Sequence, residues 1–369
     1  MDFGGDLSEK SHNAYLPVAC GRTDLKEETM AHSLRGIMSS LAVLLAICMT
    51  WGNCGAAEKL NLRLGHPMTK GDQVSQAALK FSDLLKEKSG GKIRLKVFGD
   101  CILGSDRVTT EGAQKGSLAM SSISTGNLAL FAPDFLMFDM PYIIDPDDPT
   151  ALEKLFNAVD NGKLGKHYEK VLNNIGLQLI YFGDVGYRDF QFHRKNAKSI
   201  DDLKNAKVRV TDSPVELAVA KALGMYPIPM AWGETVTAMR QGTVEGMALN
   251  NASFVALGDS ADVAKYVLDT KHNYYGHVLV MNLDLWNSLT DEQRAIIKEA
   301  AAETVKFERE LSKKLNEEAY SLMEKKGSTV NRLTPADYAR LKEMTKHVTE
   351  EYRSKVSPEA YELFIEAMN

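Results

Sequence analysis

Apolar residues along the chain alternate between two spacings, and the change of spacing predicts an alternation of strands and helices. Ile93, Leu95 and Val97 occupy every second position of one segment, which is the pattern of a strand with one buried face. Phe81 and Leu85 are four positions apart in the segment before it, which is the pattern of a helical face. Because this switch repeats along the chain, the sequence predicts an α/β fold with parallel strands.

The N-terminal half contains a first series of such segments. We expect them at 60–64 (strand), 73–89 (helix), 92–98 (strand), 106–115 (helix), 118–123 (strand), 150–161 and 163–175 (helices) and 177–182 (strand). A second α/β unit follows. We expect strands around Arg188 and Arg209, helices at 214–223 and 234–241, a strand at 244–249 and a return crossover at 265–269. The chain is long enough for two ordinary domains.

A long helical pattern covers residues 290–326, and Gly327 ends it. Its apolar stripe is compatible with a coiled coil, or with a helix that packs along both domains. A final helical pair is expected at 335–353 and 358–368.

Residues 36–51 form the most apolar run of the chain. Arg35 precedes the run and small residues follow it, which is the pattern of a secretory signal peptide. We place the signal at about residues 30–56, with cleavage near Ala56–Ala57; a membrane-anchoring signal is the alternative. The acidic segment 1–29 does not fit a signal peptide.

Composition excludes several classes of function. The net charge is −5, and no basic patch with interleaved aromatic residues suggests nucleic-acid binding. The eight histidines are scattered without metal-ligand spacing, and no catalytic motif is present. Asp145, Asp147 and Asp148 lie between prolines and are expected in a solvated loop. After cleavage only Cys101 remains, so no internal disulfide is expected.

Arg188 and Arg209 stand in apolar, strand-like surroundings. An arginine buried in a strand is unfavourable unless an anion meets it. That anion is either an acidic side chain of the same protein or a bound ligand. The planar guanidinium can donate two parallel hydrogen bonds to a carboxylate or sulfonate.

The sequence motifs around these arginines resemble those of the DctP family, the extracytoplasmic solute-binding proteins of TRAP transporters. They are GYR at 186–188, DLKNAKVRV at 202–210, PIPM at 227–230 and GTVEG at 242–246. Further motifs, LGSDR at 103–107 and FDMPY at 138–142, extend the similarity over nearly the whole mature chain.

This resemblance implies a two-domain periplasmic binding protein-like fold (Venus-flytrap), with a long C-terminal helix spanning both domains. We expect a first domain at 57–180, a second at 181–270, and a return strand with the C-terminal helices at 271–369. It also implies a periplasmic, monomeric protein without cofactor or metal that captures a small organic anion and delivers it to a TRAP permease. A binding protein for a sensor or chemoreceptor, and a secreted enzyme, are the alternatives.

The resemblance also implies the binding residues. Arg209 is expected to pair with the ligand anion and Arg188 to make a second contact, while Trp232 packs on the ligand. Lesser contacts are expected from Ser124, His66 and His272. One position departs from the family pattern: Leu249 stands where an asparagine is usual, and Asn250 follows. Either Asn250 takes over this contact, or the pocket is less polar there.

Overall fold

The structure, a computed structural model, describes residues 59–369, so the predicted signal peptide lies outside the described residues. Its strands form one sheet. They are β1 (Leu60–Gly65), β2 (Ile93–Phe98), β3 (Met120–Ser124), β4 (Leu177–Phe192), β5 (Lys207–Val210), β6 (Tyr226–Pro229), β7 (Gly246–Asn250), β8 (Tyr266–Asn282) and β9 (Thr329–Arg332).

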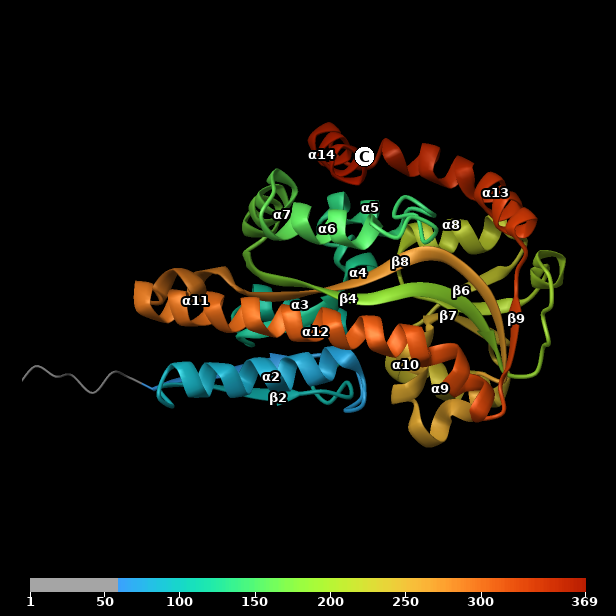
Figure 1. Cartoon of the computed structure of the whole chain (residues 1–369). Coiled ribbons are helices and arrows are strands. Elements are labelled where there is room, and N and C mark those ends of the chain that lie inside the picture. Colours follow the sequence, from blue (N-terminus) through green and yellow to red (C-terminus); the bar gives the residue numbers. More distant parts are fainter. Residues whose placement is uncertain (1–58) are drawn as a thin grey trace, which may run out of the picture. The chain divides into compact units, whose positions relative to one another are not determined.

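The helices pack on this sheet (Figure 1). They are α2 (Gln73–Lys88), α3 (Asp106–Gln114), α4 (Thr125–Leu128), α5 (Leu136–Asp139), α6 (Ala151–Asp160), α7 (Lys163–Asn173), α8 (Pro214–Ala222), α9 (Trp232–Gln241), α10 (Asn251–Ala256), α11 (Leu283–Ser288), α12 (Asp291–Lys325), α13 (Pro335–Arg353) and α14 (Pro358–Met368). Short 3₁₀ turns of the described chain lie between α4 and α5 (η1, Pro133–Phe135), between β4 and β5 (η2, Ile200–Leu203) and between α10 and β8 (η3, Gly258–Val263).

The sheet has two parallel blocks on either side of a long antiparallel pair. Its order is β2-β1-β3-β8-β4-β7-β5-β6, and β9 pairs with β8. Lobe 1 is the block β2-β1-β3 with α2, α3 and α4, and lobe 2 is the block β7-β5-β6 with α8, α9 and the short segments that join these elements. Strands β4 and β8 run through both, because β3 pairs with one part of β8 and β7 pairs with the opposite end of β4.

Two sequence predictions are corrected here. The strand expected at 177–182 and the separate strand around Arg188 are one continuous strand, β4. The crossover expected at 265–269 is only the beginning of β8, which continues to Asn282. The expected domain boundaries at 180 and 270 therefore both fall inside the strands that connect the lobes, and the division into domains stays a prediction.

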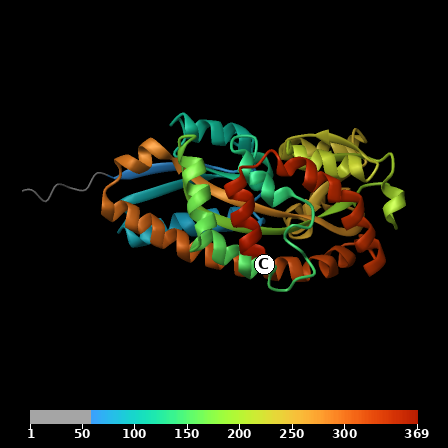
Figure 2. The ribbon, with the colours of Figure 1, turned by 90° about the horizontal axis from the view of Figure 1, so that it is seen from above.

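The long helix α12 spans both lobes, as predicted, and packs within the fold rather than in a coiled coil. Thr290 begins it with a capping box, and at about 1.5 Å per residue its 35 residues extend about 50 Å. At lobe 1 it packs on α2, where Lys88 Nζ lies 2.7 Å from Glu299 Oε1. At its other end Met323 joins the apolar cluster of lobe 2. Figures 1 and 2 show it along the sheet, on the side of α2.

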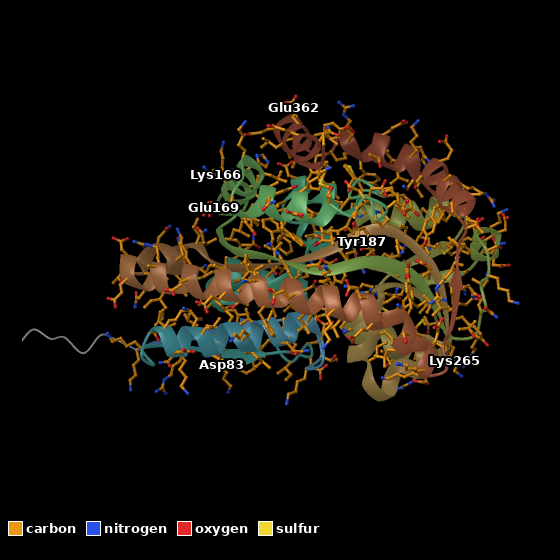
Figure 3. All side chains as sticks on the ribbon, viewed as in Figure 1. Asp83, Lys166, Glu169, Tyr187, Lys265 and Glu362 are labelled. Carbon is orange, nitrogen blue, oxygen red and sulfur yellow. The ribbon has the colours of Figure 1, made fainter. Side chains whose placement is uncertain are left out.

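Helices α6, α7 and α14 cover the other face of the sheet near lobe 1 (Figures 1 and 2). They cover part of the largest apolar cluster of the described residues. In this cluster Phe135 and Phe138 stack with Phe182 of β4, and Tyr168 meets Phe182 edge-on. Tyr187 lies further along the same strand, near the centre of the view in Figure 3. The strands that connect the lobes are thus held on both faces.

Candidate functional site

A small cavity lies between the two lobes. It is near the carboxyl ends of β1, β3 and β5, where open parallel sheets usually bind ligands. The residues around it come from both lobes and from the connecting strands: Pro67, Met68, Asp106, Ser124, Asn127, Arg188, Arg209, Thr211, Trp232, Leu249 and Tyr275. Centres of water molecules can reach only about 20 Å³ of it, which is room for about one water. The lobes are therefore closed over the cavity.

Arg209 reaches this cavity from β5. Its side chain is buried, and its Nε donates a hydrogen bond of 3.0 Å to the carbonyl oxygen of Met230. No hydrogen bond or ion pair joins its two terminal nitrogens to another described residue. Burial lowers the pKa of the guanidinium, and the nearby Glu216 carboxylate partly offsets this effect. The fork of the side chain is thus without an anion of its own.

Arg188 enters the cavity from β4 and has a protein partner. Its Nη2 lies 3.1 Å from Glu216 Oε1, and both side chains are about 1% exposed. Its Nη1 donates to the carbonyl oxygen of Ala248 at 3.3 Å, and the guanidinium lies 3.9 Å from the centre of the Tyr275 ring. The internal ion pair considered from the sequence is therefore present for Arg188 and absent, among the described residues, for Arg209.

Lobe 1 contributes a polar wall. Ser124 ends β3 and caps α4, and its hydroxyl lies 3.4 Å from Asp106 Oδ2. Asn127 Nδ2 donates to the same carboxylate oxygen at 2.8 Å. The amide oxygen of Asn127 accepts a hydrogen bond of 3.3 Å from the backbone nitrogen of Asp212, which follows β5. Asn127 therefore links the two lobes directly.

Trp232 stands at the lobe 2 side of the cavity. It is partly buried, and it begins α9 two residues earlier than the sequence predicted. The Arg209 guanidinium lies 5.8 Å from the centre of its ring, within the range of a cation–π contact. The indole and the arginine thus form one side of the cavity together.

Leu249 lines the cavity, and Asn250 does not. Successive residues of a strand point to opposite faces of the sheet, so only one of these two side chains can point toward the cavity. Asn250 is fully buried, and its Nδ2 donates to the carbonyl oxygen of Val185 at 3.0 Å. Of the two alternatives left open by the sequence, this geometry favours the less polar pocket.

His66 and His272 also lie apart from the cavity lining. His66 is buried against Gly99, and burial, with His277 nearby, lowers its pKa to about 4. His272 stacks on Phe190 with ring centres 4.2 Å apart, and burial, with Arg188 nearby, lowers its pKa to about 3. Both imidazoles are therefore neutral at pH 7. A direct contact between either histidine and a ligand stays a prediction.

The structure thus brings together Arg209, Arg188, Trp232 and Ser124 of the expected binding residues. Six further residues of the cavity lining were not among them: Pro67, Met68, Asp106, Asn127, Thr211 and Tyr275. Asp106 belongs to the LGSDR motif, which indicated the family but no role for Asp106 at the cavity. Tyr275 gives no local signal, because its contact with Arg188 depends on the pairing of β4 with β8.

Comparison with protein families identifies the chain. Residues 64–355 match the family described as "Bacterial extracellular solute-binding protein, family 7", DctP. The chain belongs to this family. The resemblance drawn from the sequence to the DctP family of TRAP transporter binding proteins is confirmed, and so is the fold expected from it. It is a family of solute-binding proteins and not of enzymes.

Individual relatives agree with this assignment. The 2,3-diketo-L-gulonate-binding periplasmic protein YiaO of Escherichia coli is 29% identical over 68% of this chain and 74% of its own. The C4-dicarboxylate-binding periplasmic protein DctP of Rhodobacter capsulatus is 27% identical over 88% of this chain and 96% of its own. The crystal structure of the sugar acid binding protein DctPAm from Advenella mimigardefordensis, in complex with galactonate, superimposes with a TM-score of 0.79. It is 25% identical and covers 84% of this chain and 98% of its own.

Within residues 59–369 no helix is long and apolar enough to cross a membrane. In the same range no group of histidine, cysteine and acidic residues has the geometry of a metal site.

Proposed function

We propose that this protein binds a small organic anion between its two lobes and delivers it to a TRAP permease from the periplasm. The observation that carries the proposal is Arg209, a buried guanidinium at the cavity whose terminal nitrogens have no anion among the described residues. A buried charge of this kind needs a counterion, and a ligand carboxylate fits the fork. Arg188 supplies a second positive group at the same cavity.

The opposite wall narrows the class of ligand. Asp106 is a carboxylate at the cavity, so it accepts hydrogen bonds from a ligand and repels a second carboxylate. The ligand we propose therefore has a carboxylate at one end and hydroxyl groups further along, as a hydroxy acid or sugar acid does. The relatives whose names mention galactonate and 2,3-diketo-L-gulonate support this choice. The relative named for C4-dicarboxylates makes succinate the natural comparison.

The small volume of the cavity supports a role for lobe movement. The present space holds about one water, so a six-carbon acid, with its many non-hydrogen atoms, needs several times that space. We propose that the lobes separate to admit the ligand and close around it, with β4 and β8 as the connection that bends. The hydrogen bond between Asn127 and Asp212 is one contact that opening breaks.

A thermal-unfolding screen tests the proposed ligand class. The mature protein is heated with galactonate, 2,3-diketo-L-gulonate, glucuronate and succinate, each at several concentrations. A ligand present at 100 times its dissociation constant stabilises the folded state by about 2.7 kcal/mol. If sugar acids stabilise the protein strongly and succinate stabilises it only slightly, this supports the proposal that Asp106 repels a second carboxylate of the ligand. If no organic acid shifts the transition, the proposed function fails.

Two alternatives need separate tests. Transport of the bound acid into vesicles that contain a TRAP permease distinguishes delivery from signalling through a chemoreceptor. Recovery of the acid unchanged after long incubation with the protein removes the secreted enzyme. We expect the protein to be a monomer, and light scattering of the same preparations measures its molar mass.

A further inference from the structure

Asp139 is a buried carboxyl group close behind the cavity. It ends α5, is completely buried, and neither of its oxygens has a hydrogen bond of ordinary geometry within the described residues. The Ser213 hydroxyl lies near enough to favour the charged form. Gly126 of α4 packs directly against the carboxyl group, and a side chain at position 126 would collide with Asp139 Oδ2. Such a group needs either a counterion or a proton.

The nearest counterion is shared. Arg188 has its Nη2 3.1 Å from Glu216 Oε1, and its charge also acts on Asp139. Glu216 is itself buried, and its second oxygen accepts a hydrogen bond of 3.1 Å from the backbone nitrogen of Thr211. One arginine thus faces two carboxyl groups on the protein side and the cavity on the other. Burial, and then the Glu216 charge, raise the pKa of Asp139 to about 7.

The other elements packed against α5 add no competing charge. His272 of β8 lies near Arg188 and is neutral, because burial lowers its pKa to about 3. Asp134 of η1 is engaged elsewhere, since its carboxylate bonds to His167 and Ser357. From α14, the ring of Phe364 packs edge-on against Phe138. Glu216 and Arg188 are therefore the charged groups that determine the state of Asp139.

We propose that the Asp139–Glu216 pair is a proton-binding site, and that the protein takes up one proton there when an organic anion binds beside Arg188 and Arg209. This rests on the proposed function. A ligand carboxylate adds a third negative group around Arg188, in surroundings where like charges repel strongly. A proton on the pair removes one of these charges, so the anion and the proton enter together.

The direction of the pH effect follows from this coupling. Below about pH 7 the pair already carries its proton in the empty protein, so the affinity for the anion changes little with pH. Above that pH the proton must be taken up from solvent, and the affinity falls by up to about tenfold for each pH unit. Asn at position 139 cannot ionise, so Asp139→Asn binds the anion with an affinity that stays flat across the same range.

Calorimetry measures the proton directly. Galactonate, or succinate if it binds more tightly, is titrated at pH 8 into the mature protein in phosphate and in Tris buffer, which differ in ionisation enthalpy. We expect uptake of close to one proton by the wild type and close to none by Asp139→Asn. Asp83→Asn, which changes an exposed acid of α2, is the matched control and keeps the full uptake. A binding enthalpy that is the same in both buffers for the wild type overturns the proposal.

A second measurement needs no ligand. The infrared band of a protonated carboxylic acid is followed in the empty protein from pH 5 to pH 9. Asp189 and Asp184 also have raised pKa values and contribute to this band, so the spectrum of Asp139→Asn is subtracted from that of the wild type. A difference band that disappears around pH 7 supports the proton site, and identical bands in the two proteins at pH 5 overturn it. If no acid binds in the calorimeter, the proposed function fails, and the infrared result still decides whether Asp139 holds a proton.

Discussion

At the scale of the residue, Arg209 is the side chain on which the proposed function depends. Arg209→Ala should weaken binding of the organic anion by about 2–5 kcal/mol, because the ligand charge loses its buried partner. This is about 30-fold to several-thousand-fold in affinity. Arg209→Lys should also bind weakly, since an ammonium group cannot replace the planar fork.

Calorimetry checks this prediction, with Arg94→Ala as the control because Arg94 is an exposed arginine of β2. The control should bind like the wild type. Near-normal affinity in Arg209→Ala would reject the site. A large loss of stability in the ligand-free Arg209→Ala protein would show instead that Arg209 serves the fold.

Trp232 should report the arrival of ligand. Its ring lies at the cavity beside Arg209, so a bound anion and tighter packing exclude water from the indole. We expect a change in tryptophan fluorescence on titration, and its loss in Trp232→Phe. Trp286 is the other tryptophan of the described residues and is buried in α11. A response of the same size in Trp232→Phe would assign the signal to Trp286.

The sequence predicted the cavity residues unevenly, for physical reasons. Arg209 and Arg188 could be predicted because a charge within an apolar strand needs an anion wherever the strand lies. The choice between Leu249 and Asn250 depends on which of the two side chains points from β7 toward the cavity. This direction follows from the register with β4, in which Asn250 pairs with Arg188, and distant residues set that register. Asp106 was missed because its place at the cavity depends on residues distant in sequence, such as Arg209, Thr211 and Trp232, that line the opposite side.

At the scale of the element, β4, β8 and α12 meet in a buried acid cluster. The Tyr320 hydroxyl lies 2.8 Å from Asp189 Oδ2 and 2.6 Å from Asp269 Oδ1. One hydroxyl has one proton to donate, so it can bond to only one of these two carboxylate oxygens at a time. Asp189 also accepts hydrogen bonds from the backbone nitrogens of Thr270 and Lys271 and from the amide of Asn251. Burial, and then the Asp269 charge, raise the pKa of Asp189 to about 7.

This cluster makes stability depend on pH. The pKa of Asp189 is higher in the folded protein than its unfolded value of about 3.9, so folding takes up a proton. The resulting stabilisation is fully present below about pH 4 and is lost as the pH rises through about 7. Between about pH 4 and pH 7 the free energy of unfolding should therefore fall less in Asp189→Asn than in the wild type. The expected difference is a few kcal/mol, since each unit of pKa shift corresponds to about 1.4 kcal/mol.

Urea unfolding from pH 4 to pH 8 tests the difference between the two proteins. In both proteins the free energy of unfolding still falls to some extent with rising pH, because burial and Glu308 raise the pKa of Asp184 to about 6. Equal slopes would mean that Asp189 does not take up a proton on folding. Asp83→Asn again serves as the exposed control.

Elements with strong local signals were predicted well, and those held by distant contacts were not. Helix α13 has the predicted bounds, because Thr334 caps it and its apolar positions repeat regularly. The middle of β4 was missed, since glycines at 183 and 186 break the pattern there. It is held instead by distant groups, such as the Glu308 carboxylate that accepts from the Asp184 nitrogen. Strand β6 contains two prolines and is possible because it lies at the edge of the sheet.

At the scale of the whole molecule, the leader predicts where the exported protein begins. Cleavage after the apolar run 36–51 should leave a chain that starts near Ala57 or Glu58. Intact-mass spectrometry of the protein released from the periplasm checks this. Retention of residues 36–51 in the mature protein would show that the run is an anchor.

The path of β8 has a consequence for the order in which the chain becomes native during synthesis. Strand β3 is made early and pairs with β1 on one side, yet its partner on the other side is the segment 277–281, made more than 150 residues later. Helix α2 likewise waits for α12, since Lys88 meets Glu299 and Glu303. Contacts this distant in sequence form slowly. The N-terminal third therefore cannot complete its sheet while it is being made, and a chain exported by the predicted leader would still be unfolded at that stage.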